Sequence, residues 1–429
     1  MGPTNIWSHV LKQTAVVITG AGCVTPLGEN VEDMWAGLMA GKNAIGPIEK
    51  FDASTYPTTF AAEIKSFTPP KLPHKLGRWL DLKTQYAISS VNQALEQAAL
   101  SSKILASART GISIGSEVSR PPLQEIAERF ALIEAGETQK AFRMTRPSEF
   151  VSRSSFFPAT AIAQHIGCSG PLLTTSTACT SSAQSIGDAL RVIRRGEADV
   201  MIAGGTDSLV EELMVMGFSL LGALSTRNED PQTACRPFDR TRDGFVLGEG
   251  AGFIVIESEA HALARGATIL GELRGFGSSA NAWRVTDSPP DGRGARSSMN
   301  AALLDAGLDG RSVNYVNAHG TSTQQNDQSE TAAIKGLFGD HASNLAISST
   351  KSMMGHLVAA CAAVELIVCL KACQEDKVPP TLNYTTPDPL CDLDFVPNLA
   401  RDMMVNVAMS NAFGFGGSNG TLLVSKYLR

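Results

Sequence analysis

Short apolar runs and longer segments of helical periodicity alternate along the whole chain. The apolar runs contain β-branched residues and are bounded by glycine or polar residues, which is typical of strands. They lie at residues 15–19, 199–203, 253–257, 315–318, 345–348, 405–410 and 421–425. Strands that alternate with helices in this way predict an α/β fold.

The clearest junction between the two patterns is at Cys179. Residues 171–178 form a β-rich approach, and Ala183, Ile186 and Leu190 then repeat on one face of a helix. A side chain at such a junction lies beside the first free N–H groups of the helix and the positive end of its dipole. These groups favour a thiolate over a thiol, whose ordinary pKa is ~8.5. The pattern therefore favours a nucleophilic cysteine suited to acyl transfer through a thioester.

The alternative interpretation of Cys179 is structural, because free cysteine is among the most buried residue types. The other seven cysteines fit that interpretation, since they lie in apolar helical segments or have no base nearby in the sequence. The chain contains no CxxC pair, and residues 1–13 contain no secretory leader. We therefore expect reduced thiols in a cytoplasmic protein, without a disulfide framework.

Composition sets further limits on function. The chain has 429 residues, a formal charge of −6 and a pI near 5.7, whereas a nucleic-acid binder would need a strongly basic domain. Its longest apolar stretch, residues 357–370, contains Glu365 and is shorter than the ~20 residues that span a bilayer. We expect no nucleic-acid partner and no membrane span, and we interpret the stretch as a buried helix.

Two parts of the chain have the same internal pattern. A strand, loop and helix at residues 345–373 repeat the order seen at residues 172–195, and each unit has a polar residue at its turn. This similarity predicts two pseudo-repeated halves, with a boundary near residues 266–277. The first half, residues 1–266, carries the cysteine, and the second, residues 267–429, carries two histidines and a lysine.

These polar residues of the second half extend the candidate site. His319 ends an apolar strand in the sequence NAHGTST, and reactive groups in α/β proteins gather beyond strand ends. Lys351 and His356 follow in the sequence STKSMMGHL. Glu365 lies on the next, apolar helix, where a carboxylate is costly unless it is paired. A buried ion pair with Lys351 is the favoured interpretation, and a solvent-facing Glu365 is the alternative.

Two glycine-rich segments have competing explanations. Residues 20–28, GAGCVTPLG, resemble a dinucleotide-binding loop, but Thr25 replaces its third glycine and Pro26 interrupts the helix start, so we disfavour a phosphate site. Residues 411–419, NAFGFGGSN, carry glycines that allow backbone N–H groups to approach a ligand closely. The two phenylalanines of this second segment form either an apolar flap or ordinary packing in a tight turn.

One cysteine and two histidines are also a possible zinc site. Cys179, His319 and His356 lack the short-range spacing of metal ligands, and a metal would occupy the thiolate that the chemistry requires. We therefore expect no metal at this site.

Taken together, these motifs resemble the type II β-ketoacyl-acyl carrier protein synthases, in order and in spacing, from Thr14 almost to the end of the chain. The matching segments are TACTS at 177–181, LSTRN at 224–228, RPFD at 236–239, RDGFVLG at 242–248, NAHGTST at 317–323, TKSMMGH at 350–356, CDLDFVP at 391–397 and NAFGFGGSN at 411–419. The resemblance implies a thiolase fold, in which two similar halves form five layers, αβαβα. It also implies a homodimer with an acyl tunnel near the subunit interface.

The resemblance implies a role for each residue of the candidate site. Cys179 would accept an acyl chain from the phosphopantetheine of an acyl carrier protein, with the N–H groups of Cys179 and Phe415 as oxyanion hole. His319 and His356 would donate hydrogen bonds to the enolate formed when malonyl-carrier protein loses CO2. Lys351, supported by Glu365, would keep both histidines neutral.

The product would be a 3-oxoacyl-carrier protein two carbons longer, made in fatty acid biosynthesis without a permanently bound cofactor. Three alternatives remain open: a ketosynthase of a polyketide or specialised-lipid pathway, a decarboxylase that releases acetyl groups, and a non-catalytic partner subunit. Such partner subunits lack the cysteine, so Cys179 argues against the last of these.

Further positions are carried over from the family for substrate binding and docking. The expected substrate-binding residues are Thr321 and Thr323 for the pantetheine arm and Phe218, Phe413 and Phe415 for the acyl channel, and the expected docking residues are Lys75, Arg78 and Arg143. The chain departs from the family at Gly222, where a docking arginine is common, and at residues 116–119 and 152–155. The last two segments are more polar than usual, which implies an acyl pocket that is shorter, more polar or differently shaped.

Overall fold

A computed structural model describes residues 14–72, 74–77, 79–144 and 146–428. Its centre is one ten-stranded sheet made of two five-stranded sets. The first set is β1 (Val16–Val24), β4 (Thr110–Ser116), β5 (Leu172–Thr175), β6 (Val200–Asp207) and β7 (Gly250–Ser258). The second set is β8 (Gly271–Ala280), β9 (Tyr315–Asn317), β10 (Ala346–Ser348), β13 (Val407–Phe413) and β14 (Ser418–Ser425).

Both sets have the same topology. The spatial orders are β5-β4-β6-β7-β1 and β10-β9-β13-β14-β8, so each set reads 3-2-4-5-1 when its strands are numbered along the chain. The first three strands in each order pair in parallel and the remaining pairs are antiparallel. The sets meet where β1 and β8 pair over two residues. This common topology confirms the predicted pseudo-repeat, while the division after Gly266 stays a prediction.

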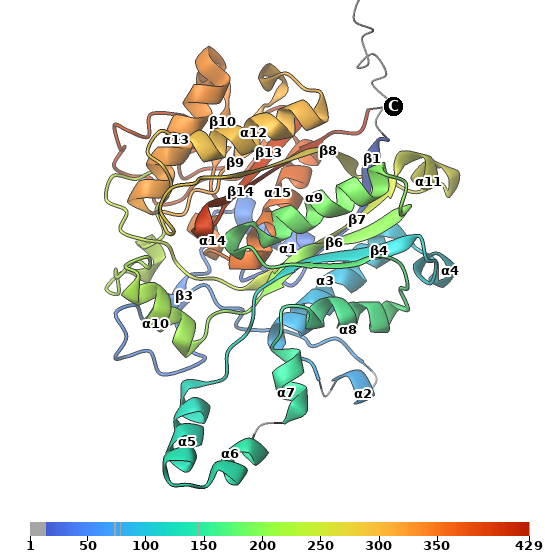
Figure 1. Cartoon of the computed structure of the whole chain (residues 1–429). Helices are drawn as coiled ribbons and strands as arrows, with labels where there is room; N and C mark the ends of the chain where they lie inside the picture. Colours follow the sequence, from blue (N-terminus) through green and yellow to red (C-terminus); the bar gives the residue numbers. More distant parts are fainter. Residues whose placement is uncertain (1–13, 73, 78, 145, 429) are drawn as a thin grey trace, which may run out of the picture.

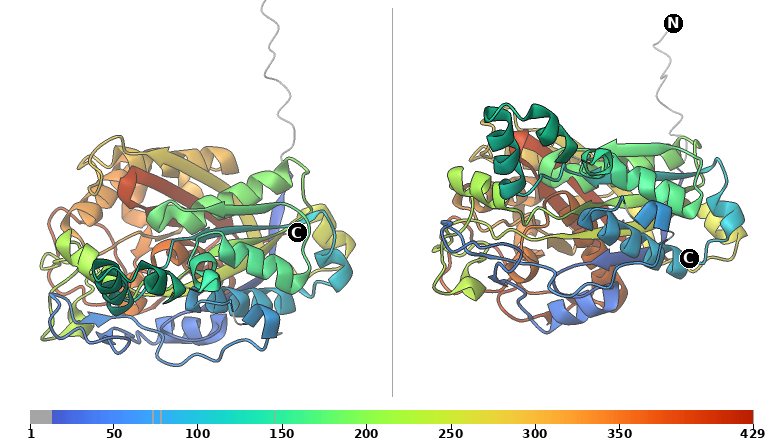
Figure 2. Two further views of the ribbon diagram at one scale, coloured as in Figure 1. Left: turned by 60° about the horizontal axis from the view of Figure 1, so that its bottom comes forward. Right: turned by 90° about the horizontal axis from the view of Figure 1, so that it is seen from below.

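The helices complete five layers (Figures 1 and 2). The middle layer is α9 (Ser181–Arg194) and α15 (Cys361–Glu375), the outer layer on the first set is α3 (Leu82–Ala98) and α8 (Phe157–Ile166), and the outer layer on the second set is α12 (Arg293–Ala306) and α13 (Gln324–Phe338). Apolar side chains of α15 and one face of α9 fill the space between the two sets. The chain therefore has the α/β thiolase architecture expected from its sequence.

The remaining elements are short or peripheral. They are α1 (Val31–Met39), α2 (His74–Gly77), α4 (Ser102–Leu105), α5 (Leu123–Glu134), α6 (Thr138–Met144), α7 (Pro147–Ser152), α10 (Glu212–Leu220), α11 (Glu259–Ala264), α14 (Lys351–Met354), β2 (Gly46–Pro47), β3 (Phe60–Ala61), β11 (Lys377–Val378) and β12 (Arg401–Asp402). Helices α5 to α7 project from the layered body at the bottom of Figure 1. Among the described residues, no helix is both long and apolar enough to cross a membrane.

The suspected dinucleotide loop is part of a strand. Gly20 and Gly22 lie inside β1, where a Cβ atom would come within 2.0 Å of the Ala94 carbonyl oxygen and 2.1 Å of the Ser90 carbonyl oxygen of α3. In the second half, a Cβ on Gly277 of β8 would meet α12 in the same way, at 2.0 Å from a carbonyl oxygen. These glycines therefore let an outer helix cross closely over the first strand of each half.

All seven predicted strands are present, and two further strands of the central sheet, β4 and β8, were missed, as were the two-residue strands β2, β3, β11 and β12. Both β4 and β8 contain glycines and several serines, which weaken a strand pattern in the sequence. The predicted boundary segment, residues 266–277, overlaps β8 and is therefore partly a strand.

Candidate active site

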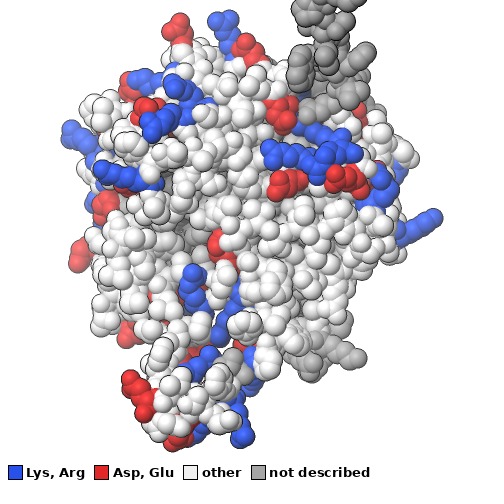
Figure 3. All heavy atoms as spheres, viewed as in Figure 1, with Lys and Arg blue, Asp and Glu red and all other residues white. Residues whose placement is uncertain are grey.

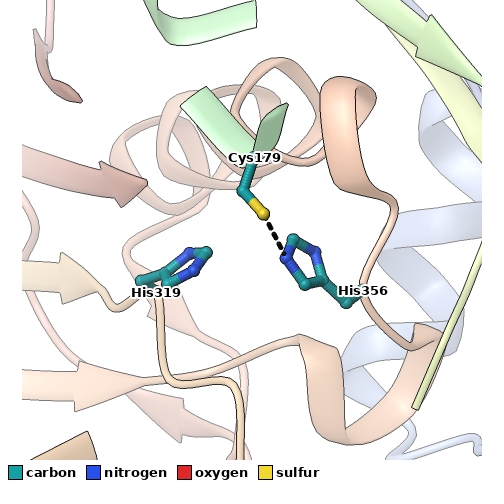
Figure 4. Close-up of side chains that lie close together, drawn as sticks. All are labelled: Cys179, His319 and His356. Atoms are coloured by element: carbon teal, nitrogen blue, oxygen red, sulfur yellow. Dashed lines mark hydrogen bonds between the residues drawn. The ribbon is translucent and has the colours of Figure 1, made fainter. Parts of the chain in front are cut away.

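A cavity of about 440 Å³ brings together residues from both halves of the chain. It is lined by Cys179 from the first half and by His319, His356 and Phe415 from the second. The sulfur and both imidazole rings have their ligand atoms within 4.8 Å of one another, and Figure 4 shows both rings close to the sulfur. The structure therefore assembles the cysteine and histidines that lie far apart in the sequence.

The cysteine lies in a sharp turn between strand and helix. β5 ends at Thr175, a 3₁₀ turn of Ala178–Thr180 follows, and α9 begins at Ser181. Ala178 has a φ of +51°, a backbone conformation that costs energy for a residue with a Cβ atom. This turn directs the Cys179 side chain into the cavity, as the junction in the sequence predicted.

The expected stabilisation of a Cys179 thiolate is outweighed by burial. Burial raises the pKa of Cys179 to about 12, although Lys351 and the N–H groups of Phe415 and Cys179 itself lower it. The resting group is therefore a thiol, which corrects the expectation from the helix terminus alone. Burial also raises the pKa of the other cysteines, and all eight are free.

His356 faces the sulfur as a hydrogen-bond donor. Its Nε2 lies 3.0 Å from Cys179 Sγ (Figure 4), and the Val358 backbone N–H donates to its Nδ1 at 3.3 Å. A neutral ring that accepts at Nδ1 carries its proton on Nε2. Burial, and then Lys351, holds the pKa of His356 well below its usual range, so the ring is neutral.

His319 lies beyond β9, with its ring centre 5.3 Å from that of His356. Glu330 of α13 fixes this loop, because its carboxylate accepts the backbone N–H groups of His319 at 2.9 Å and Gly320 at 2.8 Å. Burial, followed by Lys351 and His356, holds the pKa of His319 well below its usual range. The site thus contains two buried, neutral imidazoles.

The protonation state of these rings gives the first testable result. At pH 6 an ordinary histidine with a pKa near 6.5 is mostly protonated, whereas the depressed pKa values keep His319 and His356 neutral. Nuclear magnetic resonance of protein labelled with ¹³C and ¹⁵N in histidine should show two rings that do not titrate between pH 7.5 and 6. Their assignment from His319→Ala and His356→Ala spectra checks the result, and two rings that titrate near pH 6.5 would contradict it.

Lys351 and Glu365 form the ion pair favoured from the sequence. Lys351 Nζ lies 2.5 Å from Glu365 Oε1, and each side chain is 1% exposed. Burial works against the charge on Lys351, but Glu365, with smaller contributions from Cys361 and Glu330, outweighs it, so the pKa of Lys351 is raised. A fixed positive charge therefore lies next to both histidines.

Two backbone N–H groups converge on the sulfur. Those of Phe415 and Cys179 both form hydrogen bonds with the Cys179 sulfur that lower its pKa. Gly414 makes the approach possible, because a Cβ there would lie 3.2 Å from the Thr177 carbonyl oxygen and 3.4 Å from the Cys179 nitrogen. The arrangement has the form of an oxyanion hole.

The expected substrate-binding residues surround the same cavity. Thr321 and Thr323 line it, with their hydroxyl oxygens 3.0 Å apart. The Phe218 ring centre lies 6.3 Å from that of Phe415, and the Phe413 ring centre lies 5.6 Å from that of His319. All five therefore line the cavity that holds Cys179 and the two histidines.

Of the expected docking residues, Arg143 is exposed on the projecting α6 and is not among the described residues that line the cavity. Arg78 lies outside the described residues, and only the backbone of Lys75, in α2, is described. Gly222 lines the cavity with a φ of +63°, and nothing lies within 4 Å of a Cβ built there. Residues 152–155, at the end of α7, are not among the described residues that line the cavity.

Two carboxylates of the site were missed by the sequence analysis. Glu330 lies among polar residues of α13, and no pattern in the sequence distinguishes it from the exposed ones. Glu117 lies in a segment, residues 116–119, that departs from the family, but the sequence analysis predicted no interaction partner for it. In the structure it lies in the cavity wall beside Cys179.

The same cysteine and histidines are also the one group of possible metal ligands found among the described residues. The 3.0 Å separation of Cys179 Sγ and His356 Nε2 is that of a hydrogen bond. The absence of a metal stays a prediction.

Comparison with known proteins gives a consistent family. Residues 13–262 match the model of the β-ketoacyl synthase N-terminal domain, and residues 270–385 match that of the C-terminal domain. The chain is 44% identical over 417 residues to the 3-oxoacyl-[acyl-carrier-protein] synthase 2 of Coxiella burnetii, covering 97% of this chain and 99% of that protein.

Two solved structures are similar over the whole fold. A β-ketoacyl synthase from Burkholderia phymatum has a TM-score of 0.88 and 35% identity, covering 97% of this chain and 100% of the other. The ketosynthase of a type II polyketide synthase, solved in complex with its acyl carrier protein, has a TM-score of 0.85 and 31% identity with the same coverage.

Proposed function

The chain belongs to the β-ketoacyl synthase family, and from that premise we propose that it condenses a cysteine-bound acyl group with malonyl-acyl carrier protein in fatty acid biosynthesis. The product is a 3-oxoacyl-carrier protein two carbons longer. The observation that carries the proposal is the buried arrangement of Cys179 Sγ, two neutral imidazoles and two backbone N–H groups in one cavity.

The first half-reaction transfers the acyl group to Cys179. The sulfur attacks the thioester carbonyl of acyl-phosphopantetheine, and the N–H groups of Cys179 and Phe415 stabilise the oxyanion of the tetrahedral intermediate. The pantetheine thiol leaves with the proton of the Cys179 thiol. Because burial raises the pKa of Cys179, this step needs those N–H groups and Lys351 to favour negative charge at the sulfur.

The second half-reaction uses the histidines. Malonyl-carrier protein loses CO2, and the electron pair of the broken C–C bond passes into an enolate whose oxygen accepts hydrogen bonds from His319 and His356. The carbanion then attacks the acyl-cysteine carbonyl, and the Cys179 sulfur leaves. Neutral imidazole is a far weaker acid than imidazolium, so it donates hydrogen bonds to the enolate oxygen while protonating the carbanion much less readily.

The substrate arrives on the phosphopantetheine arm of an acyl carrier protein, and the enzyme carries no permanent cofactor. Docking of that acidic partner through basic residues such as Arg143, together with Lys75 and Arg78, is part of the proposal. Figure 3 shows basic side chains together with acidic ones on the projecting lower part of the molecule, which includes α6. A cytoplasmic location is also part of the proposal.

The experiment that tests the function is reconstitution with acyl- and malonyl-carrier proteins, followed by mass analysis of the carrier-bound product. The expected product is 3-oxoacyl-carrier protein with two added carbons. Release of acetyl-carrier protein and CO2 without extension would instead identify a decarboxylase and overturn the proposal.

We further propose a homodimer formed through the free edge of the sheet and the projecting helices. β5 is the edge strand, and edge strands expose unpaired N–H and C=O groups. Its Leu172 and the phenylalanines Phe130, Phe142 and Phe150 of α5 to α7 are exposed and apolar. Exposed large apolar side chains of this kind are typical of a subunit interface.

Sedimentation tests the dimer. The wild-type protein should sediment at twice the 45.3 kDa chain mass, and Phe142→Asp combined with Phe150→Asp should shift it towards the monomer because each change places a charge in an apolar interface. Leu399→Asp, at an exposed leucine on another loop, is the matched control and should leave the dimer intact. A wild-type monomer would contradict the proposal.

A further inference from the structure

Glu117 is a charged residue in the wall of the cavity that holds the nucleophile. It follows β4 directly and contacts the turn around Cys179 with both carboxylate oxygens. Oε1 accepts the Ala178 backbone N–H at 3.0 Å and the Ser181 hydroxyl at 3.1 Å, and Oε2 accepts the Ser176 hydroxyl at 2.8 Å. The carboxylate is thus held next to the residue that precedes the nucleophile.

The main chain around Glu117 is fixed as well. The ammonium of Lys83, whose side chain is fully buried, donates to the Glu117 carbonyl oxygen at 2.5 Å. Two residues further on, the Ser119 N–H donates to the Arg153 carbonyl oxygen at 2.9 Å. With main chain and carboxylate both anchored, Glu117 cannot turn away from a molecule that enters the cavity without breaking several hydrogen bonds.

The wall of the cavity that contains Glu117 has apolar members that suit an acyl chain, namely Leu209, Met214, Phe218, Val358 and Phe415. Its other charged members are Arg120, Asp243 and Asp287. The segment that begins at Glu117 lies along this wall, because the Arg120 N–H donates to Glu211, two residues after Leu209, at 3.1 Å. The hydroxyl groups of Thr321 and Thr323 lie in a different loop, after β9, where the pantetheine arm is proposed to bind.

An anchored carboxylate in an apolar wall discriminates between acyl groups. A long saturated chain that packs over Glu117 removes water from the carboxylate and offers no hydrogen bond in return, which is unfavourable. A short acyl group places less apolar surface against the carboxylate. The penalty therefore grows with chain length and falls mainly on the acylation of Cys179.

We propose that Glu117 is a specificity-determining residue that admits short acyl groups to Cys179 and rejects long saturated ones. The inference rests on the condensing activity proposed above and deepens it by naming the class of acyl substrate. It involves no additional covalent step.

The test compares kcat/KM for acylation of Cys179 by butyryl- and dodecanoyl-carrier protein, read by intact mass of the enzyme. Wild type should favour butyryl by about tenfold or more. Glu117→Gln keeps an oxygen that can accept the Ala178 N–H but removes the charge, so the preference should fall by about tenfold, chiefly through faster dodecanoyl transfer. Glu117→Ala should lower the preference for butyryl over dodecanoyl by at least as much. The matched control is Glu96→Gln, at an exposed position of α3, and it should leave this preference unchanged.

A residue that merely braces the turn would slow both acyl groups equally and leave their ratio unchanged, so an unaltered ratio in Glu117→Gln overturns the inference. Thermal unfolding of each variant shows whether it is folded. If Glu117→Ala does not fold, the ratio measured for Glu117→Gln alone tests the inference. Failure of the proposed function is distinct, because then wild type condenses no acyl group with malonyl-carrier protein, whatever its chain length.

Discussion

Cys179→Ala is expected to abolish condensation, with elongated product reduced by about 10⁴-fold or more, because Cys179 is the one thiol among the described residues that line the cavity. The measurement is mass analysis of carrier-bound product after incubation with acyl- and malonyl-carrier proteins. Intact mass of the enzyme should show an acyl adduct on wild type and none on the variant.

The matched control for this change is Cys168→Ala. Cys168 is a half-buried free cysteine whose thiol contacts the Thr110 carbonyl oxygen and which does not line the cavity. The control should elongate at a rate close to that of wild type. The assignment of the nucleophile would be wrong if Cys179→Ala lost much less than about 10⁴-fold of its elongated product, or if the acyl adduct appeared on Cys168.

Lys351→Met is expected to have the second-largest effect, on stability and on the outcome of the reaction. Removal of the ammonium leaves the Glu365 carboxylate buried without its partner, since each side chain is 1% exposed. Loss of one partner of a buried ion pair typically costs about 3–5 kcal/mol of folding free energy. Urea unfolding of wild type and variant measures this difference.

The same change should alter the pH dependence of product formation. Burial is the larger cause of the lowered pKa values of His319 and His356, and Lys351 lowers both further, so removal of Lys351 raises both values. As the pH falls from 7.5 to 6, more of the variant's histidines become imidazolium, which is acidic enough to protonate the carbanion. The ratio of acetyl- to 3-oxoacyl-carrier protein should therefore rise at low pH in the variant and stay flat in wild type.

A double variant separates the two effects of Lys351. Lys351→Met with Glu365→Leu replaces the pair by apolar residues, which commonly restores stability, but it does not restore the positive charge. The free energy of unfolding of the double variant should be close to that of wild type. Its ratio of acetyl- to 3-oxoacyl-carrier protein should still rise as the pH falls. A flat ratio in both variants would contradict the role given to the lysine charge.

The sequence predicted those parts of the site that depend on local pattern. The strand-to-helix junction at Cys179, the strand end at His319 and the pair formed by Lys351 and Glu365 each follow from periodicity or from the cost of a buried charge. The thiol pKa was predicted in the wrong direction, because a helix terminus is visible in the sequence but the extent of burial is not.

The other features that the sequence analysis did not predict also depend on packing that the sequence does not show. Strands β4 and β8 contain glycines that lie against helices, so packing rather than side-chain propensity makes them strands. The glycines of residues 20–28 resembled a phosphate loop for the same reason. Glu117 and Glu330 act through contacts with backbone N–H groups, and the sequence does not show which N–H groups will be near.

The most direct measurement is a two-step single-turnover experiment on wild type and a His319→Ala/His356→Ala double variant. Each protein is first charged with acyl-carrier protein, freed of excess substrate and then mixed with malonyl-carrier protein. The account predicts that both carry the acyl group on the peptide containing Cys179, and that wild type alone passes it into 3-oxoacyl product. An acyl group on a different residue, or transfer by the double variant at the wild-type rate, would contradict it.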